Sequence, residues 1–304
     1  MMKNKNIFFI KYLSKYITNI FLFLFFIFLI NITLKNDLID EDGSKKYIFS
    51  FWEPKQRIPG YLNLCIKTWK KFLPEYEIRI LDYKAVRKNL GENFFTCIVD
   101  KKMSLAIQSD AIRVAILKKY GGIWFDIDTI ITNGKFIKEI ENNELVMIGE
   151  NKMQYIAFIY ASKNSTLINE WLKEIINRVY SFNQIIKSPK NIIKNVDWNY
   201  LGNGIIDKIL YNTTNKKYLR LDKNKTIAFP ELKFFENTSL NKIEKYQLFY
   251  FQKRKVMKLL NEVKGIILLH NSWTPLKFKN MKEKEFLSED ILLSRLLTQI
   301  LNKD

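Results

Sequence analysis

Two aspartates that lie two positions apart are the strongest candidates for chemistry in this sequence of 304 residues. Asp126 and Asp128 interrupt the otherwise apolar run 123–131. In a β-strand, residues two apart point to the same side, so both carboxylates can face one ligand. Two acids in an apolar run are costly to bury unless a cation neutralises them. Because oxygen donors favour Mn²⁺ or Mg²⁺ over zinc, the pair predicts a divalent metal that accepts diphosphate oxygens at the end of the strand.

A second charged pair lies on the helix predicted for residues 101–119. Asp110 falls on the apolar, core-facing stripe of this helix, whose other members are Met103, Ile107, Val114 and Leu117. An unpaired carboxylate is expensive there, and Arg113, three residues further on, can reach it. The pair is either a buried salt bridge that joins the helix to a sheet or a functional pair in a cleft. Interior charges in a cleft are more often functional than surface charges, which favours the second interpretation.

Few other reactive side chains are available. His270 is the sole histidine, and it directly follows the apolar run 266–269, at the end of a predicted strand. A single histidine excludes a multi-histidine metal site. The chain has two cysteines, which excludes a disulfide scaffold and a cysteine-rich zinc module.

Alternating strands and helices are expected to position these residues. Apolar runs predict strands at 47–52, 77–81, 123–131, 144–148, 155–160, 226–229 and 265–269. Helical spacing predicts helices at 62–72, 101–119 and 166–180, the last capped by Ser165 and the second ended by Gly121 and Gly122. Polar stretches near 181–200 and 211–225 are predicted to be loops. The order favours an α/β domain with a mostly parallel sheet, helices on both faces and ligands at the carboxyl ends of the strands.

An uncharged segment near the N-terminus predicts a membrane anchor. Between Lys15 and Lys35 lie 19 residues without charge, enough to cross a bilayer as one helix. A signal peptide is the alternative, but no small-residue cleavage site follows. We therefore expect a basic tail at 1–16, an uncleaved transmembrane anchor at 17–34, a short stem at 35–45 and a single domain at 46–304. Lysines before the anchor and acids after it favour a cytoplasmic N-terminus.

The residues around the two aspartates resemble the sugar-binding region of glycosyltransferase family 32. The matching block comprises Ser109-Asp110, Arg113, Leu117, Tyr120-Gly-Gly122 and Asp126-x-Asp128. Similar flanks comprise Phe51-Trp52, Pro59, Leu64, Trp69 and Pro74-Glu-Tyr-Glu77, with Thr68 where serine is commoner, and the late segment His270-Asn-Ser-Trp273. The resemblance covers residues 46–280. This family includes initiating mannosyltransferases, capsular polysaccharide synthesis proteins and the glucosyltransferase domains of clostridial toxins.

The resemblance implies a GT-A fold, with a Rossmann-like sheet, that binds a nucleoside diphosphate sugar and Mn²⁺ or Mg²⁺. By position, Asp110 and Arg113 would hold sugar hydroxyls and orient the donor. Asp126 and Asp128 would bind the sugar and the metal diphosphate, and Asp128 would contact the metal. These four are the predicted catalytic residues. Gly121 and Gly122 belong to the same matching block and are included in the predicted donor site.

The flanking segments complete the predicted site. Trp52 would stack on the nucleobase, with an ordinary core tryptophan as the alternative. His270 would be a third metal ligand, a diphosphate contact or a structural histidine, and Asn271 and Ser272 are alternative ligands. Trp273 would close over the diphosphate. The segment 201–204 departs from relatives, because Asn203 stands where many have proline in a segment that lines the acceptor side.

The reaction implied by the resemblance is hexose transfer with retention of anomeric configuration. A UDP- or GDP-sugar would be the donor, and a glycan, lipid-linked or polysaccharide molecule would be the acceptor. A metal and a positive neighbour would stabilise the leaving diphosphate, and front-side attack by the acceptor hydroxyl leaves the catalytic base unassigned. The anchor predicts a single-pass membrane protein, which faces the Golgi lumen in a eukaryote and lies at the inner membrane in a bacterium.

The strong positive charge does not by itself indicate a partner. The chain carries a formal net charge of +19, and the part after residue 35 still carries +14. Lysines are scattered through every segment and no nucleic-acid-binding motif occurs, so we expect no nucleic-acid partner. Two alternatives stay open: a membrane-tethered basic protein that binds nucleic acid or another polyanion, and a catalytically silent assembly factor with the same fold.

Overall fold

The computed structural model describes residues 45–99, 103–150, 153–186, 197–212, 218–222, 230–254 and 265–302. The predicted tail and anchor, the stem up to residue 44 and the predicted strand at 226–229 lie outside these residues. Within the described ranges, no helix combines the length and apolar character needed to cross a bilayer. The structure therefore shows the globular part predicted to begin at residue 46.

A six-stranded sheet with the order β2-β1-β3-β6-β5-β7 forms the centre. Its strands are β1 (Lys46–Phe51), β2 (Tyr76–Leu81), β3 (Gly122–Phe125), β5 (Leu145–Glu150), β6 (Met153–Ala161) and β7 (Tyr218–Asp222). β1 pairs in parallel with β2 and β3, and β5 pairs in parallel with β7. β6 runs antiparallel to both of its neighbours. Every strand of this sheet except β6 thus shares one direction, so the predicted α/β class is confirmed with one reversed strand.

Side chains alternate between the two faces of the sheet, as expected for strands that are covered on both sides. On β1, Tyr47 and Phe49 enter one hydrophobic core and Ile48 enters the other. On β3, Trp124 and Phe125 separate in the same way. The sheet is therefore a wall between two cores.

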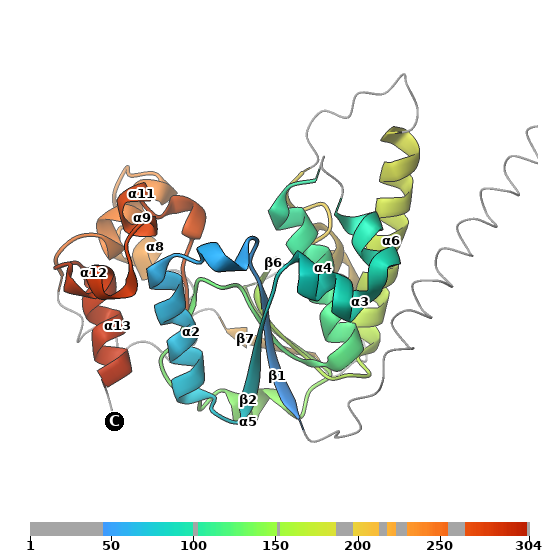
Figure 1. Cartoon of the computed structure of the whole chain (residues 1–304), viewed down its shortest axis with the longest axis horizontal. Helices are drawn as coiled ribbons and strands as arrows, with labels where there is room; N and C mark the ends of the chain where they lie inside the picture. The colour runs from blue at the N-terminus through green and yellow to red at the C-terminus, as the bar shows by residue number, and fades with distance from the viewer. Residues whose placement is uncertain are drawn as a thin grey trace, which may run out of the picture.

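Helices cover both faces of this wall (Figure 1). The Trp124 side carries α3 (Tyr83–Ile98), α4 (Leu105–Tyr120), α6 (Thr166–Ile186) and α7 (Asn203–Tyr211). The opposite side carries α2 (Gly60–Phe72), α9 (Lys242–Tyr250), α11 (Leu276–Lys279), α12 (Glu283–Ser288) and α13 (Leu292–Asn302). Short elements between them are η1 (Lys55–Arg57), α5 (Ile137–Ile140), α8 (Pro230–Phe234) and η2 (Asn271–Trp273). The late helices α11, α12 and α13 all contact α2.

The ends of two helices follow the predicted signals. Gly121 ends α4, and its N–H donates to the Leu117 carbonyl at 2.8 Å. The Ser165 hydroxyl accepts from the Ile168 N–H at 3.2 Å at the start of α6, which confirms the predicted cap. α4 itself begins after Ser104, whose side chain caps it.

Several elements differ from the predictions, among them a helix and a strand of the central part of the fold. α3 was not expected; it begins after Asp82, whose side chain accepts from the Ala85 N–H at 2.7 Å, and it is interrupted at Gly91, which has a φ of 83°. That interruption breaks the helical spacing that a sequence pattern needs. The region 211–225 was predicted to be a loop but contains β7, a strand at the edge of the sheet.

The predicted strand 123–131 is in fact two strands joined by a turn. β3 ends at Phe125, and β4 (Thr129–Ile131) pairs antiparallel with β8 (Ile266–Leu268) in a separate two-stranded sheet. The Thr129 N–H donates to the Asp126 carbonyl at 3.0 Å and closes the turn. Asp126 and Asp128 therefore lie in a turn between two sheets, and the prediction that both sit in one strand is wrong.

Candidate active site

The carboxyl ends of the parallel strands and the first half of β6 meet at one edge of the sheet. Because β6 is antiparallel, its early residues lie beside the residues that follow β3. The Asp126 N–H donates to the Ala157 carbonyl on β6 at 2.8 Å. Trp52 directly follows β1 at the same edge, where its N–H donates to the Leu81 carbonyl at 2.9 Å. The fold thus places Trp52 and Asp126 where ligands of such sheets gather.

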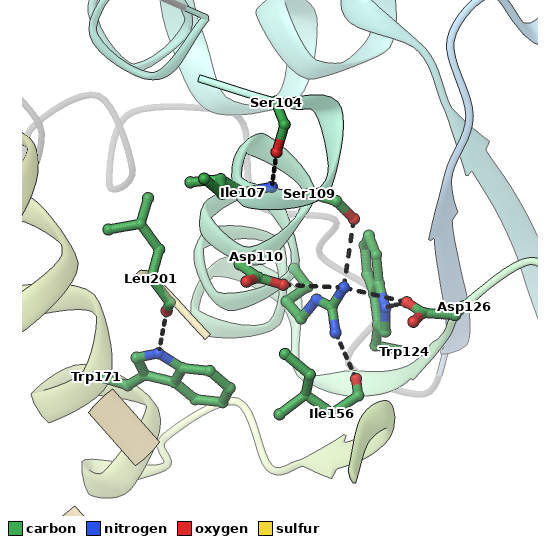
Figure 2. Close-up of polar contacts among 10 residues, drawn as sticks. Ser104, Ile107, Ser109, Asp110, Trp124, Asp126, Ile156, Trp171 and Leu201 are labelled. Carbon is green, nitrogen blue, oxygen red and sulfur yellow. Dashed lines mark hydrogen bonds and ion pairs between the residues drawn. The ribbon is translucent and has the colours of Figure 1, made fainter. Parts of the chain in front are cut away.

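A guanidinium joins two of the predicted carboxylates (Figure 2). Arg113 Nη2 lies 3.1 Å from Asp110 Oδ1 and 3.1 Å from Asp126 Oδ1. Arg113 Nη1 donates to the Ile156 carbonyl on β6 at 2.6 Å. Helix α4, strand β6 and the turn after β3 therefore meet at one side chain, and three of the four predicted catalytic residues lie together.

Burial strengthens the electrostatic interactions among these three side chains. The side chains of Asp110 and Arg113 are 7% and 5% exposed, whereas that of Asp126 is 33% exposed. Burial raises the pKa of Asp110 to about 7, against the opposing effect of Arg113 and with a further increase from Asp126. One cation thus faces two acids, and Asp126 is the member of the group that solvent and ligands can reach.

Trp124 is a member of this site that the sequence patterns did not identify. Its indole Nε1–H donates to Asp126 Oδ1 at 2.9 Å, and its ring centroid lies 5.2 Å from the Arg113 Cζ (Figure 2). The period-two rule contains a signal for it, because Trp124 precedes Asp126 by two residues and shares its side of the chain. We call Asp110, Arg113, Trp124 and Asp126 the Arg113 cluster.

Asp128 turns away from the Arg113 cluster toward the end of β8. Its Oδ2 accepts from the Asn271 N–H at 2.7 Å, and its carbonyl accepts from the Leu269 N–H at 3.1 Å. Burial, followed by the charge of Asp126, raises the pKa of Asp128 to about 7, and the Asn271 hydrogen bond only partly opposes this. We call Asp128 together with residues 269–274 the β8 end.

The β8 end is fixed by a network of hydroxyl groups. Tyr61 donates to the Asn271 side-chain oxygen at 2.5 Å and lies 3.3 Å from the Thr274 hydroxyl. The Tyr246 and Thr274 hydroxyls lie 3.2 Å apart, and Tyr246 also accepts from the His270 N–H at 3.2 Å. The backbone N–H groups that face Asp128 are thereby held in place.

His270 contacts a neighbouring ring and does not complete a metal cluster. Its ring centroid lies 3.9 Å from that of Trp273, and burial, followed by the charge of Lys242, lowers its pKa to about 4. In the part of the chain that the structure describes, no three His, Cys, Asp or Glu side chains lie close enough to hold a metal ion. The predicted ligand set of Asp126, Asp128 and His270 is therefore not assembled, because Asp126 faces Arg113 and His270 packs on Trp273.

Gly121 and Gly122 lie away from the carboxylates. They stand at the amino end of β3, whereas Asp126 follows its carboxyl end. Both have positive φ, 69° and 99°, which allows the sharp change of direction from α4 into β3. The structure thus gives these glycines a place in the turn and does not bring them to the Arg113 cluster.

Helix α2 supports the turn from the opposite core. The Trp69 indole N–H donates to the Thr129 carbonyl at 2.7 Å. The Thr68 hydroxyl accepts from the Ile131 N–H at 3.0 Å and donates to the Cys65 carbonyl at 2.6 Å. Threonine in place of serine keeps the hydroxyl that this bridge needs, and both residues fix β4 directly behind Asp128.

The segment 201–204 covers the buried end of the Arg113 cluster. The Trp171 indole N–H donates to the Leu201 carbonyl at 2.9 Å (Figure 2). Asn203 donates through its side-chain amide to the Gln154 carbonyl on β6. The residue that departs from relatives therefore has a defined partner in this chain.

Three solved structures show distant similarity. The glycosyltransferase GlyE of Streptococcus pneumoniae TIGR4 matches with 11% identity and a TM-score of 0.43, over 86% of this chain and 61% of that one. PaToxG glycosyltransferase matches with 19% identity and a TM-score of 0.36, over 66% and 79% of the two chains. The catalytic domain of alpha-toxin from Clostridium novyi matches with 12% identity and a TM-score of 0.33, over 73% and 72%. This chain thus spans less than two thirds of the GlyE structure, and no curated protein matches it.

A family match covers more than half of the chain. Residues 3–194 match the family described as capsular polysaccharide synthesis protein. This stretch contains Asp110, Arg113, Asp126 and Asp128, which belong to the block that carries the predicted resemblance. The resemblance is confirmed: the chain belongs to the capsular polysaccharide synthesis protein family and is, by family, a glycosyltransferase.

Proposed function

We propose that this protein is a metal-dependent, retaining glycosyltransferase that moves a hexose from a UDP- or GDP-sugar to a glycan, lipid-linked or polysaccharide acceptor. The observation that carries the proposal is the Arg113 cluster, in which one buried guanidinium bridges Asp110 and the accessible Asp126 at the ligand-binding edge of the sheet. Such a group offers both hydrogen-bond acceptors and a cation to a sugar diphosphate.

In this proposal, the Arg113 cluster orients the sugar. Asp126 accepts hydrogen bonds from sugar hydroxyls through the oxygen that Trp124 and Arg113 do not occupy. Arg113, held by Asp110, Asp126, the Ile156 carbonyl and the Ser109 hydroxyl, stays close to the transferred group as its bond to the diphosphate weakens. Asp110 keeps Arg113 in this position. Because these partners are in place before the ligand arrives, little reorganisation is needed during transfer.

Asp128 is the residue that fits a divalent metal. Its side chain is partly buried and stands near a second acid, and a cation would relieve the unfavourable charge that raises its pKa. Carboxylate oxygens suit Mn²⁺ or Mg²⁺, with donor oxygens and water as further ligands. When bound, the metal would neutralise the leaving diphosphate.

The two tryptophans at the rim complete the donor site. Trp52, at the end of β1, would stack on the nucleobase, and Trp273, on η2, would close over the diphosphate. Trp52 follows β1, the strand beside β3, and Trp273 lies two residues after Asn271, whose N–H donates to Asp128. Both side chains are partly buried, which supports these roles. The acceptor hydroxyl would attack on the face that the leaving group departs from, which retains the configuration and needs no carboxylate nucleophile.

The proposed setting is a membrane. The uncharged segment at 17–34 would anchor the chain as a single-pass protein, with the catalytic domain beside lipid-linked or polysaccharide acceptors. In a bacterium this would be the inner membrane, and in a eukaryote the Golgi membrane.

Donor hydrolysis tests the proposal. We expect the purified full chain to release UDP or GDP from a panel of UDP- and GDP-hexoses with Mn²⁺, and to lose this activity in EDTA. Asp126→Ala and Asp128→Ala should abolish the release while the protein stays folded by circular dichroism. Asp290→Asn, which alters an exposed acid, is the matched control and should keep the activity. Calorimetry that detects no binding of any donor with Mn²⁺ would support the catalytically silent alternative.

A further inference from the structure

A glycine lies directly against the carboxylate of Asp110. A methyl group placed on Gly202 would lie 2.5 Å from Asp110 Oδ2 and 2.7 Å from the Cδ1 of Ile156. Both distances are far below van der Waals contact, so only glycine fits while the neighbours stay where they are. Asp110 is thus enclosed, with Arg113 at Oδ1 and the Gly202 backbone at Oδ2.

The Asp110 carboxylate is the neighbour of Gly202 that cannot easily give way. It is fixed by the place of Asp110 on α4 and by Arg113, which holds its Oδ1. The other neighbour, Cδ1 of Ile156, is the end of a flexible side chain and can move without breaking the bond from Arg113 to the Ile156 carbonyl. Displacement of the Asp110 carboxylate, in contrast, disturbs the guanidinium.

The segment that carries Gly202 is itself firmly tied. Trp171 on α6 donates to the Leu201 carbonyl, and Arg178 on the same helix donates to the Tyr200 carbonyl at 2.6 Å and to the Gly204 carbonyl at 3.2 Å. The Asn203 amide adds the link to β6. Hydrogen bonds from α6 and to β6 therefore hold the backbone of the segment 200–204 in place.

We propose that Gly202 is a positioning residue of the donor site, which acts through Asp110. The missing side chain gives Asp110 the space to hold Arg113, and Arg113 in turn holds Asp126. This inference rests on the proposed function and deepens it, because it makes Gly202 part of the donor-binding machinery. Any side chain at position 202 displaces the carboxylate and, through Arg113, disturbs sugar binding at Asp126.

Donor kinetics of Gly202→Ala test the proposal, with Gly204→Ala as the matched control. A methyl group on Gly204 would lie 2.7 Å from the Asn199 carbonyl, so this variant strains the same segment without touching Asp110. We expect Gly202→Ala to lower kcat/KM for the donor by about tenfold, and Gly204→Ala to have a clearly smaller effect at equal folded fraction. Equal losses in the two variants would overturn the proposal, because they would show a general effect of the strained segment.

A double-mutant cycle then asks whether the effect passes through Asp110. In an Asp110→Ala background the contact with the carboxylate is gone and only the flexible end of Ile156 has to move, so Gly202→Ala should change kcat/KM by less than about twofold there. A tenfold further loss in that background would overturn the proposal. The same cycle measured as melting temperature needs no activity: Gly202→Ala should lose stability in the wild-type chain and lose much less in Asp110→Ala.

The two measurements separate the possible failures. If the wild-type chain processes no donor, the proposed function fails, and the melting-temperature cycle alone decides whether Gly202 positions Asp110. If donors are processed but neither cycle shows coupling, the proposed function stands and the role of Gly202 is refuted.

Discussion

The Arg113 cluster and the β8 end hold their carboxylates by different means. In the Arg113 cluster, side chains from α4 and β3 surround two acids with a guanidinium and an indole N–H. At the β8 end, Asp128 faces backbone N–H groups that a hydroxyl network fixes from behind. The first region contains its own cation, whereas the second is the place where we propose that a metal binds. Two acids only two residues apart can therefore have separate tasks.

The two regions also differ in their relation to the family. The Arg113 cluster and Asp128 lie within the residues 3–194 that match the family, whereas residues 265–302 lie beyond them. The family match thus covers the carboxylates of both regions. The partners of Asp128 at the β8 end rest on the geometry of this chain alone.

The largest expected effect comes from removing the guanidinium. Arg113→Met leaves two carboxylates facing each other in a buried place, so we expect a loss of about 3–5 kcal/mol in the free energy of unfolding and no measurable donor release. Urea denaturation measures the first and nucleotide release the second. Arg87→Met, which breaks an exposed pair with Glu92, is the control and should cost less than about 1 kcal/mol. If Arg113→Met is as stable as the wild type, Arg113 does not stabilise the fold by neutralising the two carboxylates.

The pH dependence of stability is the second expected effect. Burial raises the pKa of Asp110 from 3.8 to about 7, so the folded protein binds the proton more tightly than the unfolded chain. Stability of the metal-free protein should therefore fall as pH rises from about 4 to about 7, by an amount on the order of 4 kcal/mol for this carboxyl group, and level off above that.

Asp110→Asn separates the contribution of Asp110 from that of Asp128. This variant should flatten part of the decline, and the rest should remain because Asp128 also has its pKa raised to about 7. Urea denaturation at pH 5 and pH 8 in EDTA gives both values. An unchanged slope in Asp110→Asn would mean that Asp110 does not titrate in this range.

Substitution of one buried tryptophan in each region should have a smaller effect. Trp124→Phe removes a donor to a charged carboxylate, whereas Trp69→Phe removes a donor to the neutral Thr129 carbonyl behind the β8 end. Hydrogen bonds to charged groups contribute about 1.5–3 kcal/mol and neutral ones about 0.5–1.5 kcal/mol, so Trp124→Phe should be the more damaging in donor kcat/KM. Steady-state kinetics of both variants at matched stability decide this. A larger loss of kcat/KM in Trp69→Phe would show that donor turnover depends more on the support behind the β8 end than on the Trp124 bond in the Arg113 cluster.

The smallest expected effect lies at Thr68. Thr68→Val removes the hydroxyl that bridges the Cys65 carbonyl and the Ile131 N–H, and we expect a loss of about 1 kcal/mol in unfolding free energy. Thr68→Ser keeps the hydroxyl and should recover most of it. If Thr68→Ser is as unstable as Thr68→Val, the methyl group rather than the bridge supports β4.

Spacing along single elements predicted much of this site. The helical stripe placed Asp110 in the core, and the step of three brought Arg113 beside it. The same reasoning could not show that Arg113 also reaches Asp126, since that contact depends on how α4 packs against β3. The expectation that residues two apart in a strand point to the same side failed for Asp128. β3 ends at Phe125, and Asp128 lies in the turn that leads to β4 in the other sheet.

Contacts between distant segments were beyond the reach of sequence patterns. Asn271 is 143 residues from Asp128, and only the pairing of β4 with β8 brings them together. The enclosure of Asp110 by Gly202 likewise depends on the path of a segment between two helices. Alternation of strands and helices predicted the α/β class, but β6 runs against it because β5 and β6 are neighbours joined by a short connection.

The pairing of β4 with β8 has a consequence for the newly made chain. Asp128 leaves the ribosome long before the segment at 265–274 that is its partner. Chains fold from their N-terminal parts first during synthesis, so the Arg113 cluster can form while the β8 end is still being translated. A truncated or unfinished polypeptide would then have the Arg113 cluster without the partners of Asp128. Synthesis of residues 265–274 would thereby be the step that completes the surroundings of Asp128.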